Sequence, residues 1–132
     1  MIKARIFDHI DLRVADMAAA QKFFGQLLPA LGFTDPIGND AWRGYQVPGD
    51  GPEAFFGFEL DANHRPGETR IAFWAESRAE VDRLTEIVRQ AGGLNVDGPA
   101  VEADYSPGYY AVFFDDPSGN KLEICCRDSR PS

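Results

Sequence analysis

Residues 9–16 read HIDLRVAD and residues 70–77 read RIAFWAES, so the chain contains two similar strand-like stretches. Each is followed by a helix-like pattern that ends at glycine, and this order repeats although few residues are identical. The sequence therefore predicts two copies of one structural module. The copies differ at their first position, where His9 in one is matched by Arg70 in the other.

Each copy predicts a helix from a capping residue followed by apolar residues at a spacing of about 3.6 residues. Asp16 is the expected cap in the first copy, and Gly32 follows the helix. In the second copy Ser77 and Glu80 have the spacing of a capping box, and Gly92 marks the end. The apolar stripes are Met17, Ala20, Phe23, Phe24, Leu27 and Leu28 in the first copy, and Val81, Leu84, Ile87, Val88 and Ala91 in the second.

Short β-like runs separated by turn residues follow each helix. They lie near residues 33–37, 41–47 and 53–60 in the first half, and near residues 95–101, 109–116 and 121–127 in the second. We therefore expect an α+β fold in which two βαβββ modules form a curved mixed sheet, a cup, with the helices on its outer face. The expected single domain covers residues 1–132, with module one at about 1–62 and module two at about 68–128.

The net charge of −8 and the isoelectric point near 4.6 argue against nucleic acid and anionic membranes as partners, because both require a dense basic face. No apolar run approaches the roughly 20 residues that span a bilayer. Residues 1–10 also lack the apolar core and cleavage site of a signal peptide. We expect a soluble, cytoplasmic protein. The adjacent Cys125 and Cys126 fit a reducing compartment, since neighbouring strand residues point to opposite faces and cannot easily bridge each other.

Alternation along the predicted strands separates a helix-packing face from the opposite face. Four polar residues fall on the face turned away from the helices: His9, Glu59, Arg70 and Glu123. The repeat matches His9 with Arg70, and it matches Glu59 with Glu123 because each of these glutamates precedes an aliphatic residue. If the two modules curve around this face, the four side chains meet near its centre.

Four segments together resemble the vicinal oxygen chelate superfamily, which contains glyoxalases, bleomycin resistance proteins and extradiol dioxygenases. They are DHIDLRVADMAAAQKFF at 8–24, FELDANH at 58–64, IAFWAESRAEVD at 71–82 and GYYAVFFDDPSGNKLEI at 108–124. The resemblance covers almost the whole chain, and the DPSGNKLEI part is its most specific element. It implies two βαβββ modules around a metal, and single-cup members of the family often form homodimers.

The resemblance also implies metal ligands at His9, Glu59 and Glu123, with Arg70 at the fourth position. The expected cofactor is therefore either none or a divalent metal such as Ni, Zn, Fe or Mn. In metal-dependent relatives a carboxylate moves a proton while the metal polarises the substrate, which makes Glu123 and Glu59 the catalytic candidates. A guanidinium has no lone pair to offer a metal, so Arg70 cannot complete the set.

This mismatch motivates a specific hypothesis for Arg70: its guanidinium lies within hydrogen-bond reach of Glu123 or Glu59, with no ion between them. In the alternative interpretation, Arg70 is a solvated residue at a strand end. The candidates for contact with a small-molecule ligand are Arg70, Trp74, Tyr109, Tyr110 and Phe7, and Trp42 and Tyr105 are further aromatic candidates. His64 offers another imidazole but lies in the turn between the modules.

Three functions are compatible with these residues. The first is a metal-independent protein that binds a small molecule, with a degenerate metal site. The second is a metal-dependent lyase, isomerase or dioxygenase, of which a glyoxalase I-like lyase and a dioxygenase are the enzyme candidates. The third is a non-catalytic interaction module, because a fold does not by itself determine an activity. No phosphate-binding loop or nucleophile elbow is present, so the motifs for nucleotide hydrolysis and acyl transfer are missing.

Overall fold

The computed structural model describes residues 7–127, so Asp128, which the sequence places at the end of module two, lies outside the described residues. The described chain has the element order β-α-β-β-β twice. The elements are β1 (His9–Val14), α1 (Met17–Ala30), β2 (Asp35–Gly38), β3 (Trp42–Gln46), β4 (Phe55–Leu60), β5 (Arg70–Trp74), α2 (Arg78–Ala91), β6 (Leu94–Val101), β7 (Tyr110–Asp115) and β8 (Lys121–Cys126). The predicted pair of βαβββ modules is confirmed.

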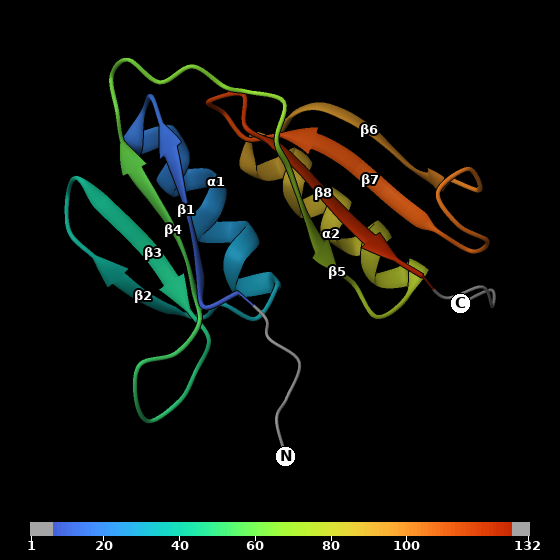
Figure 1. The fold of residues 1–132 in the computed structure, drawn as a ribbon, viewed down its shortest axis with the longest axis horizontal. Coiled ribbons are helices and arrows are strands. Elements are labelled where there is room, and N and C mark those ends of the chain that lie inside the picture. Colours follow the sequence, from blue (N-terminus) through green and yellow to red (C-terminus); the bar gives the residue numbers. More distant parts are fainter. Residues whose placement is uncertain (1–6, 128–132) are drawn as a thin grey trace.

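The strands divide between two mixed four-stranded sheets, one for each module (Figure 1). The strand order is β1-β4-β3-β2 in module one and β5-β8-β7-β6 in module two. In each sheet the first strand pairs in parallel with the last, and the remaining pairs are antiparallel. The two modules therefore have the same topology, and their strands can be compared position by position.

Both helices begin at the residues that the sequence predicted. The side chain of Asp16 accepts a hydrogen bond from the amide of Ala19, and that of Ser77 accepts one from the amide of Glu80. The second helix ends at Gly92, whose φ of 103° is a left-handed conformation that favours glycine. No helix within residues 7–127 is both long and apolar enough to cross a membrane.

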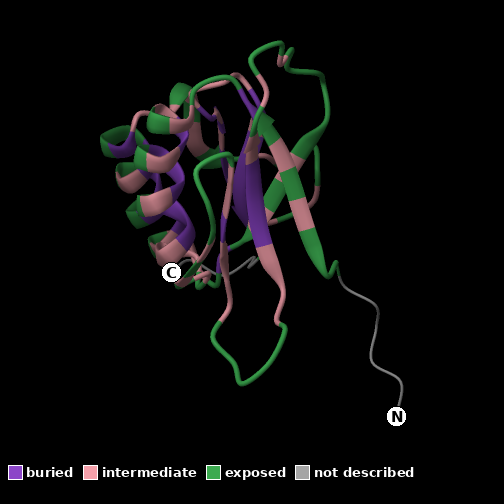
Figure 2. Cartoon of the chain, turned by 90° about the vertical axis from the view of Figure 1, so that its left-hand side faces the viewer, coloured by how far each residue is buried: buried purple, intermediate pink, exposed green. Residues whose placement is uncertain are grey.

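The helices cover one side of the sheets and leave the opposite side uncovered (Figure 2). Their buried residues pack on alternate strand residues, and residues of both modules join one core cluster. Phe23 of α1 contacts Phe114 of β7 with ring centroids 6.2 Å apart, and Phe56 of β4 contacts Phe73 of β5 at 5.4 Å. Burial of large aromatic side chains across this boundary stabilises the pairing of the modules.

The turn between β7 and β8 ties module two to module one. Asn120 donates a hydrogen bond from its side-chain amide to the carbonyl of Arg13 at 2.8 Å, and Ser118 accepts one from the amide of Ala15 at 2.9 Å. The fully buried Asp116 holds the turn by accepting hydrogen bonds from Asn120 and Ser118. Burial raises the pKa of Asp116, and these hydrogen bonds oppose the rise. The DPSGN segment, specific to the family resemblance, therefore has a structural role here.

Candidate functional site

The register of the two parallel strand pairs shows which positions of the modules are equivalent. His9 lies opposite Phe55 in module one, and Arg70 lies opposite Lys121 in module two. His9 and Arg70 are therefore counterparts, as the repeat predicted, and Phe55 and Lys121 are counterparts on the neighbouring strands.

The same register corrects the predicted pairing of the two glutamates. Glu123 lies two residues after the start of β8, so its counterpart two residues after the start of β4 is Gly57. Glu59 corresponds instead to Cys125. The sequence comparison assumed that the two Glu-aliphatic pairs occupy equivalent strand positions. In the structure Glu59 lies two residues further along its strand than Glu123 does, on the same face of the sheet. Glu59 and Glu123 are therefore not equivalent.

Module one fills the position equivalent to Glu123 with its own side chains. The indole Nε1 of Trp42 donates a hydrogen bond to Asp11 Oδ1 at 2.7 Å, directly over Gly57. A Cβ atom added at Gly57 would lie 2.3 Å from Asp11 Oδ1 and 3.1 Å from the indole nitrogen. A larger residue at this position would therefore have to displace the side chains of Asp11 and Trp42.

His9 and Glu59 have local partners on the module-one sheet. The imidazole of His9 stacks on Phe55 with ring centroids 4.5 Å apart, and its Nδ1 lies 2.8 Å from Asp8 Oδ1. Glu59 lies 3.6 Å from the guanidinium of Arg13, and both side chains are about half exposed. An ion pair this exposed contributes little to stability.

These residues do not fit a resident metal. The four equivalent positions hold His9, Gly57, Arg70 and Glu123, so only two of them carry a metal-ligand side chain. Within residues 7–127 no group of three or more His, Cys, Asp or Glu side chains is arranged to hold an ion. The structure thus does not bring His9, Glu59 and Glu123, the ligand set implied by the resemblance, into one site.

Glu123 forms a different arrangement in module two. Its side chain is 4% exposed, and its Oε2 accepts a short hydrogen bond from the hydroxyl of Tyr109, which is 6% exposed. Burial raises the pKa of Tyr109 above its ordinary value of 10.0, and the neighbouring Cys125 and Glu123 side chains raise it further. The phenol therefore remains a proton donor to the carboxylate at neutral pH. The other oxygen, Oε1, accepts no hydrogen bond from the described residues, and it is not among their fully buried polar atoms that lack a partner.

The hypothesis that Arg70 pairs with a carboxylate is wrong in this structure. Its Nη1 donates to the carbonyl of Leu122 at 2.8 Å, and its guanidinium lies 5.0 Å from the ring centroid of Phe113. Among the described residues its hydrogen-bond and ion-pair partners include neither Glu59 nor Glu123. The reason is positional, because Glu123 lies opposite Ala72, and Tyr109 already occupies one of its oxygens.

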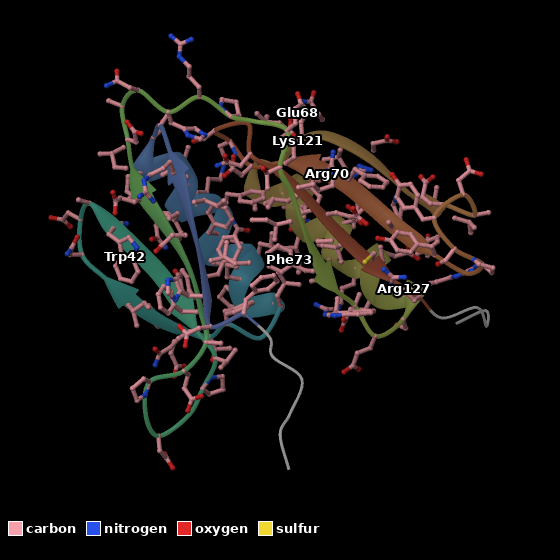
Figure 3. The ribbon with its side chains drawn as sticks, viewed as in Figure 1. Trp42, Glu68, Arg70, Phe73, Lys121 and Arg127 are labelled. Carbon is pink, nitrogen blue, oxygen red and sulfur yellow. The ribbon has the colours of Figure 1, made fainter. Side chains whose placement is uncertain are left out.

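Aromatic rings and arginines surround Glu123 on the side of β5, β7 and β8 that faces away from α2, which we call the Glu123 face. Tyr105 lies 6.1 Å from Phe113 and 5.2 Å from Tyr109, measured between ring centroids. Arg127 lies over Tyr109 at 5.2 Å and over Trp74 at 5.7 Å. Figure 3 shows Arg70 and Lys121 at one end of the β5–β8 pair and Arg127 at the other. These contacts form a continuous row beside the carboxylate.

Two other candidates lie away from this row. The hydroxyl of Tyr110 donates to Asp82 of α2 at 2.7 Å, and Arg78 lies over the ring at 5.2 Å, so Tyr110 faces the helix side. This corrects its predicted place beside Tyr109, because neighbouring strand residues point to opposite faces. Phe7 is 80% exposed just before β1, in the other module.

A polar cavity of about 260 Å³ lies at the outer edge of module one, between α1 and the β2–β3 hairpin. Its lining includes Gln21, Arg43 and Tyr45. Gln21 donates to the hydroxyl of Tyr45 at 2.7 Å and accepts from Arg43 at 3.1 Å. The polar groups of this cavity thus have partners within the protein.

Sequence reasoning missed Arg127, and it grouped Tyr105 and Tyr109 only as members of a wider aromatic set. The signal for Arg127 was present, because the alternation that places Glu123 on the open face continues through Cys125 to Arg127. The contact of Tyr105 depends on the loop before β7, for which the sequence offered no periodic pattern.

The model of the Glyoxalase/Bleomycin resistance protein/Dioxygenase superfamily matches residues 6–124, and the chain belongs to this superfamily. The uncharacterized protein YqjT of Bacillus subtilis (strain 168) is 32% identical over 122 residues, which cover 88% of this chain and 94% of YqjT.

Solved structures agree with this assignment. A glyoxalase/bleomycin resistance protein from Albidiferax ferrireducens T118 has a TM-score of 0.72 and 26% identity, with 92% of this chain and 98% of that chain covered. The fosfomycin resistance protein FosX from Mesorhizobium loti shares the fold, with a TM-score of 0.66, 15% identity, and 96% and 93% of the two chains covered.

Proposed function

We propose that this glyoxalase/bleomycin-resistance-like protein binds a small molecule on the Glu123 face of module two. The observation that carries the proposal is Glu123 itself. It is a carboxylate more than nine-tenths buried, with one oxygen held by Tyr109 and the other free to accept a hydrogen bond. A ligand hydroxyl or N–H group that reaches this second oxygen would form a charge-assisted hydrogen bond with it.

The contrast between the modules supports this location. In module one the equivalent position is Gly57, covered by the hydrogen bond between Trp42 and Asp11. In module two the flanking residue on β5 is Ala72, which is exposed, so nothing of comparable size covers Glu123 from that strand. Module two thus combines a buried carboxylate, Glu123, with the exposed aromatic side chains of Trp74 and Tyr105.

We further propose that the metal position of the superfamily is degenerate in this chain. Gly57 and Arg70 replace two potential ligands, and Tyr109 engages the carboxylate that would be a third. The chemistry that remains is hydrogen bonding and, where a ligand carries an acidic proton, transfer of that proton to Glu123.

A fragment screen by ligand-observed NMR tests the binding proposal on protein dialysed against EDTA. The library holds single-ring acids, amides and amines, and each hit is repeated with Glu123→Gln and with Glu59→Gln. Glutamine keeps the size of the side chain and removes its charge. We expect hits whose affinity falls with Glu123→Gln and is unchanged with Glu59→Gln. Hits that depend equally on both glutamates, or only on added Ni or Zn, would contradict the proposal.

We also propose that the protein forms a homodimer and resides in the cytoplasm. In the described residues β1 pairs only with β4 and β5 only with β8, so each sheet has an edge strand available to a second copy. Cys125 and Cys126 are free and buried, which agrees with a reducing compartment. Sedimentation equilibrium tests the dimer, and a monomer at high protein concentration would contradict it.

A further inference from the structure

We propose that the ligand is a single-ring aromatic acid whose anionic group lies at one end of the ring and whose hydroxyl or N–H donor lies at the other. This inference rests on the proposed function, because it specifies what binds to the Glu123 face. Each of the three chemical parts of the ligand corresponds to a different part of the site.

Arg127 is the partner of the anionic group. Its guanidinium lies over the rings of both Trp74 and Tyr109, which orients it toward the Glu123 face. An arginine in this position retains N–H donors for a carboxylate or a similar anion, and stacking on aromatic rings holds the planar fork in place.

Trp74 and Tyr105 provide surface for the ring of the ligand. Their side chains are 71% and 61% exposed, which is unusual for large aromatic residues. On the same face Ala72, which lies opposite Glu123 and is exposed, carries only a methyl group. A flat ring can lie above Ala72 and contact the exposed aromatic side chains through offset stacking.

Glu123 is the partner of the hydroxyl or N–H donor, and the spacing of the site sets the length of the ligand. The guanidinium of Arg127 lies over the ring of Tyr109, and the hydroxyl at the far end of that ring contacts Glu123. The cation above this ring and the carboxylate at its hydroxyl therefore lie within about one ring length of each other. A ligand with an anion and a donor on opposite ends of one ring matches this separation.

The distribution of charge agrees with an anionic ligand. The protein has a net charge of −8, yet Arg70, Lys121 and Arg127 lie around the Glu123 face without a carboxylate at ion-pair distance in the described residues. Elsewhere in the described residues four arginines pair with carboxylates, Arg13, Arg43, Arg83 and Arg89, whereas Lys22, Arg65 and Arg78 do not. Three cations near one face favour an anion there against the general repulsion of the acidic protein.

Isothermal titration calorimetry with four related compounds tests the ligand class on the full chain. 4-Hydroxybenzoate contains all three parts. Benzoate lacks the hydroxyl group, 4-hydroxybenzamide lacks the charge, and trans-4-hydroxycyclohexanecarboxylate lacks the aromatic ring. We expect 4-hydroxybenzoate to bind most tightly and the neutral amide to bind at least about tenfold more weakly, because a charged hydrogen bond is lost.

Two variants separate a specific contact from a general effect of charge. Arg127→Gln should weaken 4-hydroxybenzoate about tenfold and leave 4-hydroxybenzamide nearly unchanged, since only the acid uses the guanidinium. Arg83→Gln is the matched control, because Arg83 lies on α2 and pairs with Glu80 at 3.6 Å. It should leave the binding of both compounds unchanged.

The outcomes show whether the proposed ligand class is wrong, or whether the proposed binding site is wrong as well. If the amide binds as tightly as the acid, or if Arg127→Gln weakens both equally, the aromatic acid is the wrong class while the site remains. If none of the four compounds binds but other fragments show the dependence on Glu123 described above, the class is again wrong and the site stands. If no fragment of any charge shows that dependence, the class and the proposed function both fail.

Discussion

The hydroxyl of Tyr109 donates a hydrogen bond to the carboxylate of Glu123, and both side chains are almost fully buried. In the equivalent place in module one there is a glycine beneath a tryptophan, so the two halves of this repeat have diverged most strongly at this point. A phenol bound to the carboxylate performs part of the role that a cation would otherwise have, since it stabilises the carboxylate by a hydrogen bond. The consequences of this pair can be measured.

Tyr109→Phe should destabilise the protein by about 1–3 kcal/mol, because it removes the hydrogen-bond partner of a buried carboxylate without changing the size of the ring. Urea unfolding followed by circular dichroism provides the measurement. Tyr105→Phe is the control, since Tyr105 is 61% exposed and should lose little stability. Equal effects of the two substitutions would show that the hydrogen bond to Glu123 has no special role.

The stabilisation from Tyr109 should depend on pH in a defined direction. Below about pH 10 the phenol is protonated in both the folded and the unfolded state, and its contribution is fully present. Above that pH the unfolded phenol ionises while the folded one, whose pKa is raised mainly by burial, stays protonated. The free energy of unfolding then falls as pH rises.

Because the phenylalanine variant lacks this phenol, the difference in stability between the native protein and Tyr109→Phe should narrow between pH 9 and pH 11. Urea unfolding at several pH values in this range tests the direction, and the other tyrosines cancel in the comparison. A difference that stays constant or widens would mean that the pKa of Tyr109 is not raised in the folded protein.

Arg70→His should not create a divalent-metal site, although it places a second imidazole at a position equivalent to His9. Gly57 offers no ligand at the remaining position of module one, and Tyr109 engages Glu123 in module two. Equilibrium dialysis with Ni and Zn should give the same result for the native protein, for Arg70→His and for the linker control Arg65→His. One tightly bound ion found only in Arg70→His would revive the metal hypothesis.

Arg70→Ala should cost only about 1 kcal/mol, the value of one hydrogen bond, because Arg70 donates to the carbonyl of Leu122 and does not neutralise a buried carboxylate. Thermal or urea unfolding measures this cost against Arg65→Ala. A loss of several kcal/mol would indicate that Arg70 compensates a carboxylate after all.

Asn120→Ala should destabilise the protein by about 1–3 kcal/mol, because it leaves the buried Asp116 and the carbonyl of Arg13 short of a donor. Asn63→Ala is the control, since Asn63 is exposed in the linker between the modules. If the two variants are equally stable, the turn does not hold the modules together.

The fold was predictable because local signals agreed with one another. The caps at Asp16 and Ser77, the helical stripes and the strand alternation all lie in short windows of sequence. Neighbouring strand residues point to opposite faces, which the sequence analysis used for Cys125 and Cys126 but not for Tyr109 and Tyr110. Only one of two neighbouring strand residues can line a given face, and here it is Tyr109.

The partners of the site residues were less predictable because they depend on strand register. The similarity of Glu59 and Glu123 in sequence suggested equivalence, yet the parallel pairing with β1 and β5 offsets them by two residues. The partner of Arg70 depends in the same way on which residue of β8 lies beside it. Such offsets arise from pairing between strands far apart in the chain, which residue patterns within one strand do not record.

The central claim is that ligands bind to the Glu123 face of module two without a metal, and the two tryptophans of the chain test it most directly. Trp74 lies on that face, and Trp42 is hydrogen-bonded to Asp11 on the other module. Each indole N–H gives its own signal in a proton–nitrogen NMR spectrum, assigned with Trp74→Phe and Trp42→Phe. In EDTA-treated protein, single-ring acids, amides and amines that bind should move the Trp74 signal saturably and leave the Trp42 signal in place. Saturable movement of the Trp42 signal alone, or movement of either signal only after a divalent metal is added, would contradict the claim.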